Sequence, residues 1–314
     1  MPFSSTLPVK VVSIRLAAVA AAAALALTGC TTASQTSNVA PSGSTKFDPS
    51  TVQRDDALAA MVPAALKSKG TIDVGSDTSY APAEALGGSD GQTPVGYDVD
   101  FAKAIAATLG LKADVHTADF TGILPALGPK YDLGISSFTI TPERLKAVNL
   151  VSYFNAGTLW AVQKGNPKKF SLDDICGKSV GVQTGTVEEN PDVSGRSKKC
   201  TDAGKPAIKV VTLKTQTDVT TRLVNGSIDA MSADSPIINY ALSQTGDKLE
   251  LLGDLYDAAP QGIAVAKKDT ALAEVVSKVM NKLISDGTYT KILEAWNNTK
   301  GAISKSEVNP AVGS

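Results

Sequence analysis

The chain has 314 residues, 43% of them hydrophobic, which is enough for one large domain or two ordinary ones. Its 30 basic and 31 acidic residues give a formal net charge of −1, so there is no electrostatic attraction for nucleic acid. The single histidine, His116, excludes a histidine-rich zinc site and would have to serve in any catalytic triad.

The first thirty residues have the pattern of an export signal. Lys10 and Arg15 precede an apolar run over 16–27, and the segment Leu27-Thr28-Gly29-Cys30 follows. A basic start, a short apolar stretch and small residues at the cleavage point are typical of secretory signals. The alternative, a transmembrane anchor, needs about 20 apolar residues. The last four residues resemble a bacterial lipobox, which implies that a lipoprotein signal peptide, 1–29, is removed and that Cys30 carries a lipid anchor.

Two further segments have too few aliphatic residues to form a core. Within 30–69, a stretch rich in Ser, Thr, Asn, Gln, Pro and Gly predicts a flexible tether, followed by an N-terminal extension. The segment 301–314 has a similar composition, and we expect a flexible tail there. After residue 30 no apolar run comes near the length of a membrane span.

Strand and helix patterns alternate between these segments. The expected strands are 71–75, 112–118, 131–136, 148–151, 159–162, 179–182, 208–211, 228–232, 250–252 and 262–266. The expected helices are 98–110, with Asp98 as N-cap, 121–127, 142–147, 217–225, 236–243, 271–285 and 289–296. This alternation predicts α/β layers with mainly parallel sheets, and roughly 230 ordered residues favour two lobes over one sheet.

Cys176 and Cys200 remain after the signal. In an exported chain thiols oxidise, so one disulfide bond is favoured over a metal site, which would need more ligands. A free buried pair is the alternative. A bridge over a loop of about 25 residues would add roughly 3–4 kcal/mol of stability on the chain-entropy model.

The common catalytic and nucleotide-binding motifs do not occur. The segment 181–186 lacks the third glycine of a dinucleotide fingerprint and the Lys-Ser/Thr end of a phosphate loop. His116 lies in an alternating strand pattern and is interpreted as a surface or packing residue. The sequence therefore predicts neither a cofactor nor a metal ion.

Seven segments carry the most specific pattern, and in chain order they are SDTSYAP (76–82), VGYDVD (95–100), DFTGILPAL (119–127), SSFTITPER (136–144), GVQTGTV (181–187), IDAMSAD (228–234) and DGTY (286–289). Together they resemble the extracellular solute-binding proteins of family 3, the receptors of polar amino-acid ABC importers. The resemblance covers residues 70 to 300. Finer details around the two cysteines and the segment 256–260 look like an actinobacterial branch.

The resemblance implies a periplasmic-binding-protein-like fold of type II, in which two α/β lobes are joined by a two-strand hinge. Lobe 1 would be 70–152 plus 262–300, and lobe 2 would be 158–258. The hinge segments would be 153–157 and 259–261, where Gly157 and Pro260 suit chain reversals.

A free amino acid carries a carboxylate and an ammonium group, and the resemblance places a partner for each. Arg144 would bind the carboxylate, because a guanidinium fork matches it in two places. The alternative is a surface arginine paired with Glu143 or another acid. Asp234 would bind the ammonium group from the carboxyl end of a strand, where open α/β sheets bind ligands. It is also a plausible helix N-cap, and the two roles are compatible.

The other expected ligand-binding residues follow from the same motifs. Tyr80 and Phe120 match an aromatic pair around the ligand side chain, with core packing as the alternative. Ser137 and Thr139, with Phe138 between them, match positions that donate hydrogen bonds. The remaining site residues are Asp77, Gln183, Thr186 and Val187, where Val187 replaces a residue with a hydroxyl or a glycine in many relatives.

These expectations describe a monomeric receptor, lipid-anchored at the extracellular face of the cell membrane, that delivers a polar amino acid to the transmembrane subunits of an ABC permease. It would perform no catalytic step. The alternatives are a periplasmic-type dehydratase on the same fold, with Asp77 or Asp234 as acid or base, and a sensor that docks onto a receptor. Because no second cation matches a side-chain carboxylate, glutamine-, histidine-, lysine- or arginine-like ligands are favoured.

Overall fold

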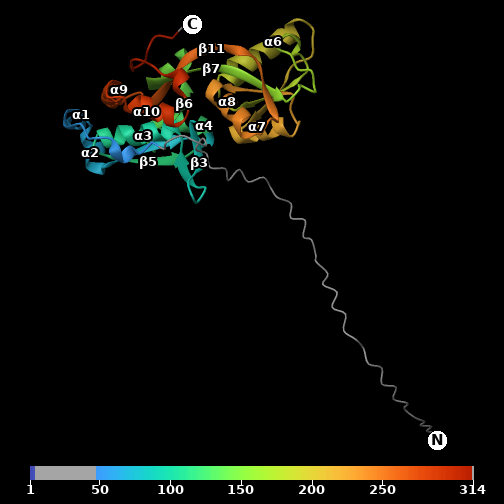
Figure 1. Cartoon of the computed structure of the whole chain (residues 1–314), viewed down its shortest axis with the longest axis horizontal. Coiled ribbons are helices and arrows are strands. Elements are labelled where there is room, and N and C mark those ends of the chain that lie inside the picture. The colour runs from blue at the N-terminus through green and yellow to red at the C-terminus, as the bar shows by residue number, and fades with distance from the viewer. Residues whose placement is uncertain (4–46, 313–314) are drawn as a thin grey trace. The chain divides into compact units, whose positions relative to one another are not determined.

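The computed structural model describes residues 1–3 and 47–312 (Figure 1). The predicted apolar signal, the predicted lipidation site Cys30 and most of the predicted tether lie outside the described residues. In the part of the chain that is described, no helix has the length and apolar character needed to cross a membrane.

The described elements alternate between strand and helix, as predicted. The strands are β1 (Thr71–Ser76), β2 (Ser79–Tyr80), β3 (Glu84–Gly87), β4 (Thr93–Val95), β5 (Lys112–Thr117), β6 (Leu133–Thr139), β7 (Val148–Gln163), β8 (Ser179–Gln183), β9 (Lys209–Leu213), β10 (Ala230–Asp234) and β11 (Leu249–Ala266). The helices are α1 (Asp56–Ala60), α2 (Ala64–Lys69), α3 (Tyr97–Thr108), α4 (Phe120–Ile123), α5 (Pro142–Ala147), α6 (Ser194–Asp202), α7 (Gln216–Val224), α8 (Ser235–Gln244), α9 (Thr270–Ser285) and α10 (Thr288–Ala295).

One mixed sheet in the order β5-β1-β6-β11-β7-β10-β8-β9 organises the fold. β1 pairs in parallel with β5 and β6 on one side of the long strands, and β8 pairs in parallel with β9 and β10 on the other. β7 and β11 run antiparallel between these two groups (Figure 1). The result is two α/β lobes that share two long strands. A separate antiparallel sheet, β2-β3-β4, was not predicted.

The two long strands correct the prediction of separate short strands and chain reversals at the hinge. Residues 148–163 form one continuous strand, and its pairing with β11 shifts register between Leu252 and Tyr256, between Tyr256 and Ala259, and between Gln261 and Gly262. Gly157 lies inside β7. A Cβ there would be 2.7 Å from Leu255 Cδ2, so glycine permits the close approach of β11. The predicted hinge segments coincide with this irregular pairing, and the exact lobe bounds stay a prediction.

Helices bury the apolar faces of both halves of the sheet. In α9, Leu272, Val276, Val279 and Leu283 recur at helical spacing and are at most 5% exposed. These side chains pack in one hydrophobic cluster with buried residues of α3 and α10. Trp160, from the second half of β7, is fully buried in a second cluster near β8 and α6. Each lobe therefore has apolar packing that holds its binding residues in place.

Over residues 301–312, the part of the predicted flexible tail (301–314) that the structure describes, the C-terminal segment is held by hydrogen bonds, which contradicts the prediction there. Within the described residues, the Ser152 N–H donates to Glu307 O at 3.0 Å and the Leu150 N–H donates to Asn309 Oδ1 at 2.9 Å. Val308 forms an isolated bridge with Val151. The segment thus supplies hydrogen-bond partners to the first residues of β7, whose other side already pairs with β11.

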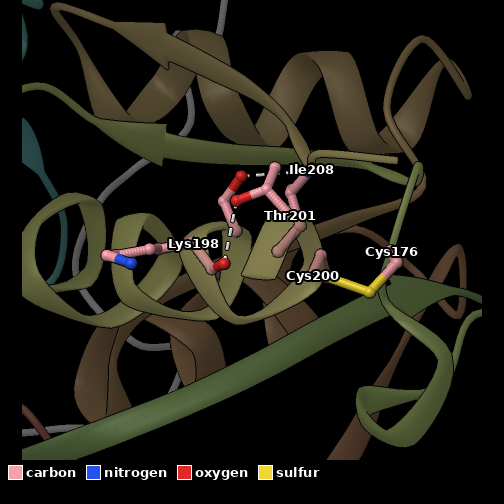
Figure 2. The surroundings of a disulfide bond; sticks show 6 residues. Cys176, Lys198, Cys200, Thr201 and Ile208 are labelled. Carbon is pink, nitrogen blue, oxygen red and sulfur yellow. Dashed lines mark hydrogen bonds between the residues drawn. A yellow bond between two sulfur atoms is a disulfide. The ribbon is translucent and has the colours of Figure 1, made fainter. Parts of the chain in front are cut away.

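Cys176 and Cys200 join a loop of the second lobe to α6 (Figure 2). The Sγ atoms lie 2.01 Å apart and the Cα atoms 5.6 Å apart. Cys200 is 3% exposed and packs in the same cluster as Trp160 and Val180. The helix α6 itself was not predicted, because its sequence is polar and has no apolar stripe.

Candidate functional site

A pocket between the two halves of the sheet gathers residues from both lobes. The gaps between its side chains, with the solvent at its opening included, amount to about 270 Å³, and little of this space is free because side chains already contact one another across the cleft. Its lining residues are Asp77, Tyr80, Glu84, Phe120, Ser137, Thr139, Arg144, Gln183, Thr186, Val187, Glu188 and Asp234. Every predicted binding residue except Phe138 is among them. Phe138 stacks on Phe120 at 4.9 Å between ring centroids.

Arg144 enters the pocket from the first turn of α5. Pro142 begins this helix, as the predicted bounds 142–147 require, and Thr141 caps it, which was not predicted. The guanidinium donates to Thr139 O at 2.8 Å and to Gly185 O at 3.0 Å, and it lies 5.6 Å from the Phe120 ring centroid. Within the described chain it forms no ion pair with Glu143. Burial lowers the pKa of Arg144, while Glu188 and Asp234 favour its charge.

Asp234 ends β10 and occupies the N-cap position of α8, but its side chain caps no N–H there. Instead, Oδ2 accepts hydrogen bonds from the Tyr80 hydroxyl at 2.9 Å and from Gln261 Nε2 at 3.0 Å. Burial, together with the nearby carboxyl group of Glu188, raises the pKa of Asp234 well above its usual value. The carboxyl group is therefore desolvated and directed into the cleft, where a cation would stabilise its charge.

Asp77 meets the opposite lobe directly. Gln183 Nε2 donates to Asp77 Oδ2 at 2.6 Å, and the same oxygen accepts the Phe120 N–H at 3.2 Å. Burial raises the pKa of Asp77, and these hydrogen bonds oppose the rise. Asp77 and Gln183 thus form a second polar contact across the cleft, separate from the hydrogen bonds of Arg144 and Asp234.

The lobe 2 loop contributes less side-chain chemistry than predicted. The Thr186 hydroxyl donates to Gln183 O at 2.9 Å and accepts the Glu189 N–H. Its donated hydrogen and one accepting position are therefore used within the loop. The Val187 side chain offers only apolar contact.

Sequence reasoning missed two acids of the pocket, Glu84 and Glu188. Both are at most 2% exposed, and burial raises the pKa of each. Glu84 Oε1 accepts from Ser136 Oγ at 2.8 Å, and Glu188 Oε1 accepts from Thr158 Oγ1 at 3.3 Å. A carboxyl group inside the small-residue run APAEA and another directly after Val187 were the available signals.

Among the residues that the structure describes, one group of potential metal ligands is found, and it lies outside the pocket. Asp73, Asp114 and His116 on β1 and β5 place ligand atoms within 4.8 Å of one another. Asp73 is already paired with Lys69, and His116 Nε2 lies 3.0 Å from Asp73 Oδ1. The group is therefore a network of polar contacts at the edge of the sheet, and His116 is half-buried there, in line with its interpretation as a surface or packing residue.

Two lobes that share two long strands, with a polar cleft between them, define the class of two-lobed binding proteins. Within this class the chain belongs to the bacterial extracellular solute-binding proteins, family 3, whose sequence pattern it matches over residues 72–299. This confirms the family and the type II fold predicted from the seven segments.

Similarities to individual proteins extend over most of the chain. The arginine-binding protein ArgT of Corynebacterium glutamicum is 31% identical over 289 residues, which cover 92% of each chain. An ancestral arginine-binding protein solved with arginine is 36% identical, with a TM-score of 0.65, over 72% of this chain and 98% of that one. The ancestral amino-acid-binding protein AncCDT-1, a precursor of cyclohexadienyl dehydratase, is 32% identical with a TM-score of 0.63, over 74% and 97%.

Proposed function

We propose that this protein is the substrate-binding receptor of an ABC importer and that its ligand is an amino acid with a cationic side chain, arginine first. The family assignment and the arginine-binding relatives support the receptor role. The choice of ligand rests on one observation, the excess of carboxyl groups over cations among the residues that line the pocket.

The charges in the pocket separate into two groups. In the first group, the carboxyl groups of Asp234 and Glu188 stabilise the charged form of Arg144. This group can bind the backbone of an α-amino acid, with Arg144 at the carboxylate and the acids at the ammonium group. In the second group, Asp77 is hydrogen-bonded to Gln183, and the negative charge of Asp77 helps to raise the pKa of Glu84. A ligand side chain that reaches Asp77 gains most if it carries a positive charge, and the Phe120 face adds a surface on which a guanidinium can stack.

Glutamine is the second candidate ligand. An ancestral arginine-binding protein has also been solved with glutamine, and an amide side chain can donate to Asp77 without a charge. The ratio of arginine to glutamine affinity therefore measures how much Asp77 contributes as an anion.

The dehydratase alternative has support from the likeness to AncCDT-1. Glu188 is a buried acid with a raised pKa, a property that general acids share. In the present arrangement it lies beside Arg144 and Asp234, whose charges serve binding. The receptor proposal therefore predicts that a bound amino acid leaves the protein unchanged, and mass spectrometry of the recovered ligand checks this.

The export signal and lipobox of the sequence support a location at the extracellular face of the membrane, with Cys30 as the anchor. We further propose that the Cys176–Cys200 bond forms after export, and that the protein acts as a monomer with the permease as partner. Mass spectrometry of the mature N-terminus is the direct test of the anchor.

A thermal-shift screen of the twenty amino acids and cystine tests the ligand. A ligand at about 100 times its dissociation constant adds about 2.7 kcal/mol of stability, or a shift of roughly 5–10 °C for a chain of this size. We expect arginine to give the largest shift. No shift with any of these compounds would contradict the receptor proposal.

A further inference from the structure

We propose that Gln261 is a positioning residue of the ammonium subsite and that it holds the Asp234 carboxyl group, from the hinge, in the orientation that binds the ligand. The inference rests on the proposed amino-acid binding at this pocket. It adds a residue to which the sequence gave no role beyond membership of the hinge segment 259–261. Gln261 is 1% exposed and does not itself line the pocket.

The contact between the two side chains is direct. Gln261 Nε2 donates to Asp234 Oδ2 at 3.0 Å, and the Tyr80 hydroxyl donates to the same oxygen at 2.9 Å. Among the described residues, every hydrogen bond to the Asp234 carboxyl group is made at Oδ2. Two donors at one oxygen restrain the rotation of the carboxyl group, so Oδ1 is the oxygen left for the ammonium group of a ligand.

Gln261 reaches Asp234 from the pivot of the two lobes. Its backbone is paired with Thr139 of β6 and with Phe154 of β7, whereas Asp234 ends β10 in the second lobe. Atoms near a hinge move least when the lobes rotate, so this contact can persist in both the open and the closed form. Tyr80 belongs to the first lobe and bridges the cleft, so opening should separate it from Asp234. Gln261 would then be the residue that keeps the carboxyl group oriented before the ligand arrives.

The amide oxygen of Gln261 shows that this glutamine is not explained by packing. Oε1 is buried and has no hydrogen-bond partner among the described residues. A buried carbonyl without a partner costs free energy, and a methionine of similar length would avoid that cost. An ionised carboxylate only accepts hydrogen bonds, so Nε2 is the atom that must face Asp234. The donor at Nε2 is therefore the feature for which the glutamine is needed.

Asp234 depends on such donors because its surroundings disfavour its negative charge. Burial raises the pKa of Asp234 well above its usual value, and the carboxyl groups of Glu188 and Asp98 add to the rise. Asp98 lies in the first turn of α3, whose N-cap position is Gly96, which corrects the predicted N-cap role of Asp98. A hydrogen bond from Gln261 favours the ionised form of the carboxyl group. Loss of this donor should therefore weaken both the orientation and the charge that an ammonium group needs.

Gln261→Met tests this role, because it keeps the length of the side chain and removes the donor. Gln163→Met is the matched control. Gln163 also lies on a long strand, and its Nε2 also donates one hydrogen bond, to Val224 O at 3.1 Å, but neither residue lines the pocket.

Two ligands separate an effect on Asp234 from a general effect on the hinge. L-arginine carries the ammonium group, and 5-guanidinopentanoate is the same molecule without it. Closure of the lobes affects both ligands, whereas the orientation of Asp234 affects only the ligand with an ammonium group. The ratio of the two losses of affinity therefore isolates the interaction between Gln261 and ammonium recognition.

Isothermal titration in the full mature chain measures this ratio, with L-arginine titrated directly and 5-guanidinopentanoate by competition against it. We expect the arginine affinity of Gln261→Met to fall by a factor at least three times larger than its affinity for 5-guanidinopentanoate. Gln163→Met should follow the wild type for both ligands. A smaller difference between the two losses in Gln261→Met would overturn the proposal.

Nuclear magnetic resonance of the Gln261 side-chain amide gives a second readout that needs no ligand. In the ligand-free protein, Asp234→Asn should move the resonances of this amide, because a charged acceptor is replaced by a neutral one, and should leave those of the Gln163 amide in place. An unmoved Gln261 amide would contradict the proposal even if Gln261→Met fails to fold. If the wild type binds no amino acid while the amide resonances move, the proposed ligand is wrong and the positioning of Asp234 stands.

Discussion

Asp234 and Arg144 come from different lobes, so one amino acid would bridge the cleft through its own two charges. Removing a partner from a buried charge pair costs roughly 2–5 kcal/mol, or about 30-fold to several thousand-fold in affinity. We expect the arginine affinity of Asp234→Ala, measured by isothermal titration, to fall by this factor. Circular dichroism should show that the variant keeps its fold. Asp254→Ala, an exposed acid of the same lobe, is the control. Equal affinities for the two variants would contradict the ammonium role.

Asp77 decides the side-chain preference in this account. In Asp77→Asn the anion becomes an amide, so a guanidinium loses a charged partner whereas a glutamine amide keeps a hydrogen-bond acceptor. We expect arginine affinity to fall at least tenfold and glutamine affinity to change by less than threefold, measured by titration of each ligand. If both ligands lose affinity equally, Asp77 acts only through its hydrogen bonds to Gln183 and the Phe120 N–H.

The sequence predicts the pocket well where a residue's type and its neighbours carry the information. Arg144 follows a Thr-Pro helix start, and Asp234 ends a strand, so their positions follow from local rules. Glu84 and Glu188 lack such a signal. Their place in the pocket depends on the small sheet β2-β3-β4 and on an irregular turn, and both depend on tertiary contacts.

At the scale of elements, the disulfide anchors α6 to the second lobe. A bond between residues 24 positions apart stabilises by roughly 3–4 kcal/mol on the chain-entropy model. Exported protein should show no free thiol at Cys176 or Cys200 without reductant, and Cys176→Ser with Cys200→Ser should unfold at lower denaturant concentration. Arginine affinity should stay within threefold, because neither cysteine lines the pocket. Alkylation of both thiols in native, unreduced protein would contradict the bond.

Elements with strong periodicity were predicted closely, and those that depend on neighbours were not. The expected helix 271–285 differs from α9 by one residue, because an apolar stripe faces the core. β7 and β11 were divided into shorter strands, since burial along nearly the whole of β7 removes the alternation that marks a strand. The C-terminal segment was assigned to a tail because its polar groups bind the backbone and side chains of other segments, which composition does not show.

For the whole molecule, a ligand that contacts both lobes holds them together. The structure already shows contacts across the cleft, from Tyr80 to Asp234 and from Gln183 to Asp77. We expect the lobes to rotate about the segments 153–157 and 259–261, with the open form populated without ligand and the closed form with it. Small-angle scattering should show a smaller radius of gyration with saturating arginine. Superimposable curves would contradict a closing receptor.

The central claim is that Arg144 binds the carboxylate of an amino acid held between the lobes. The most direct test is isothermal titration of L-arginine into the wild type and Arg144→Ala, with Arg144→Lys and the exposed Arg222→Ala as comparisons. The account predicts a loss of at least about 30-fold for Arg144→Ala, weak binding for Arg144→Lys because a point charge cannot reproduce the fork, and unchanged binding for Arg222→Ala. An Arg144→Ala affinity within about threefold of the wild type would contradict it, because a surface arginine would behave in that way.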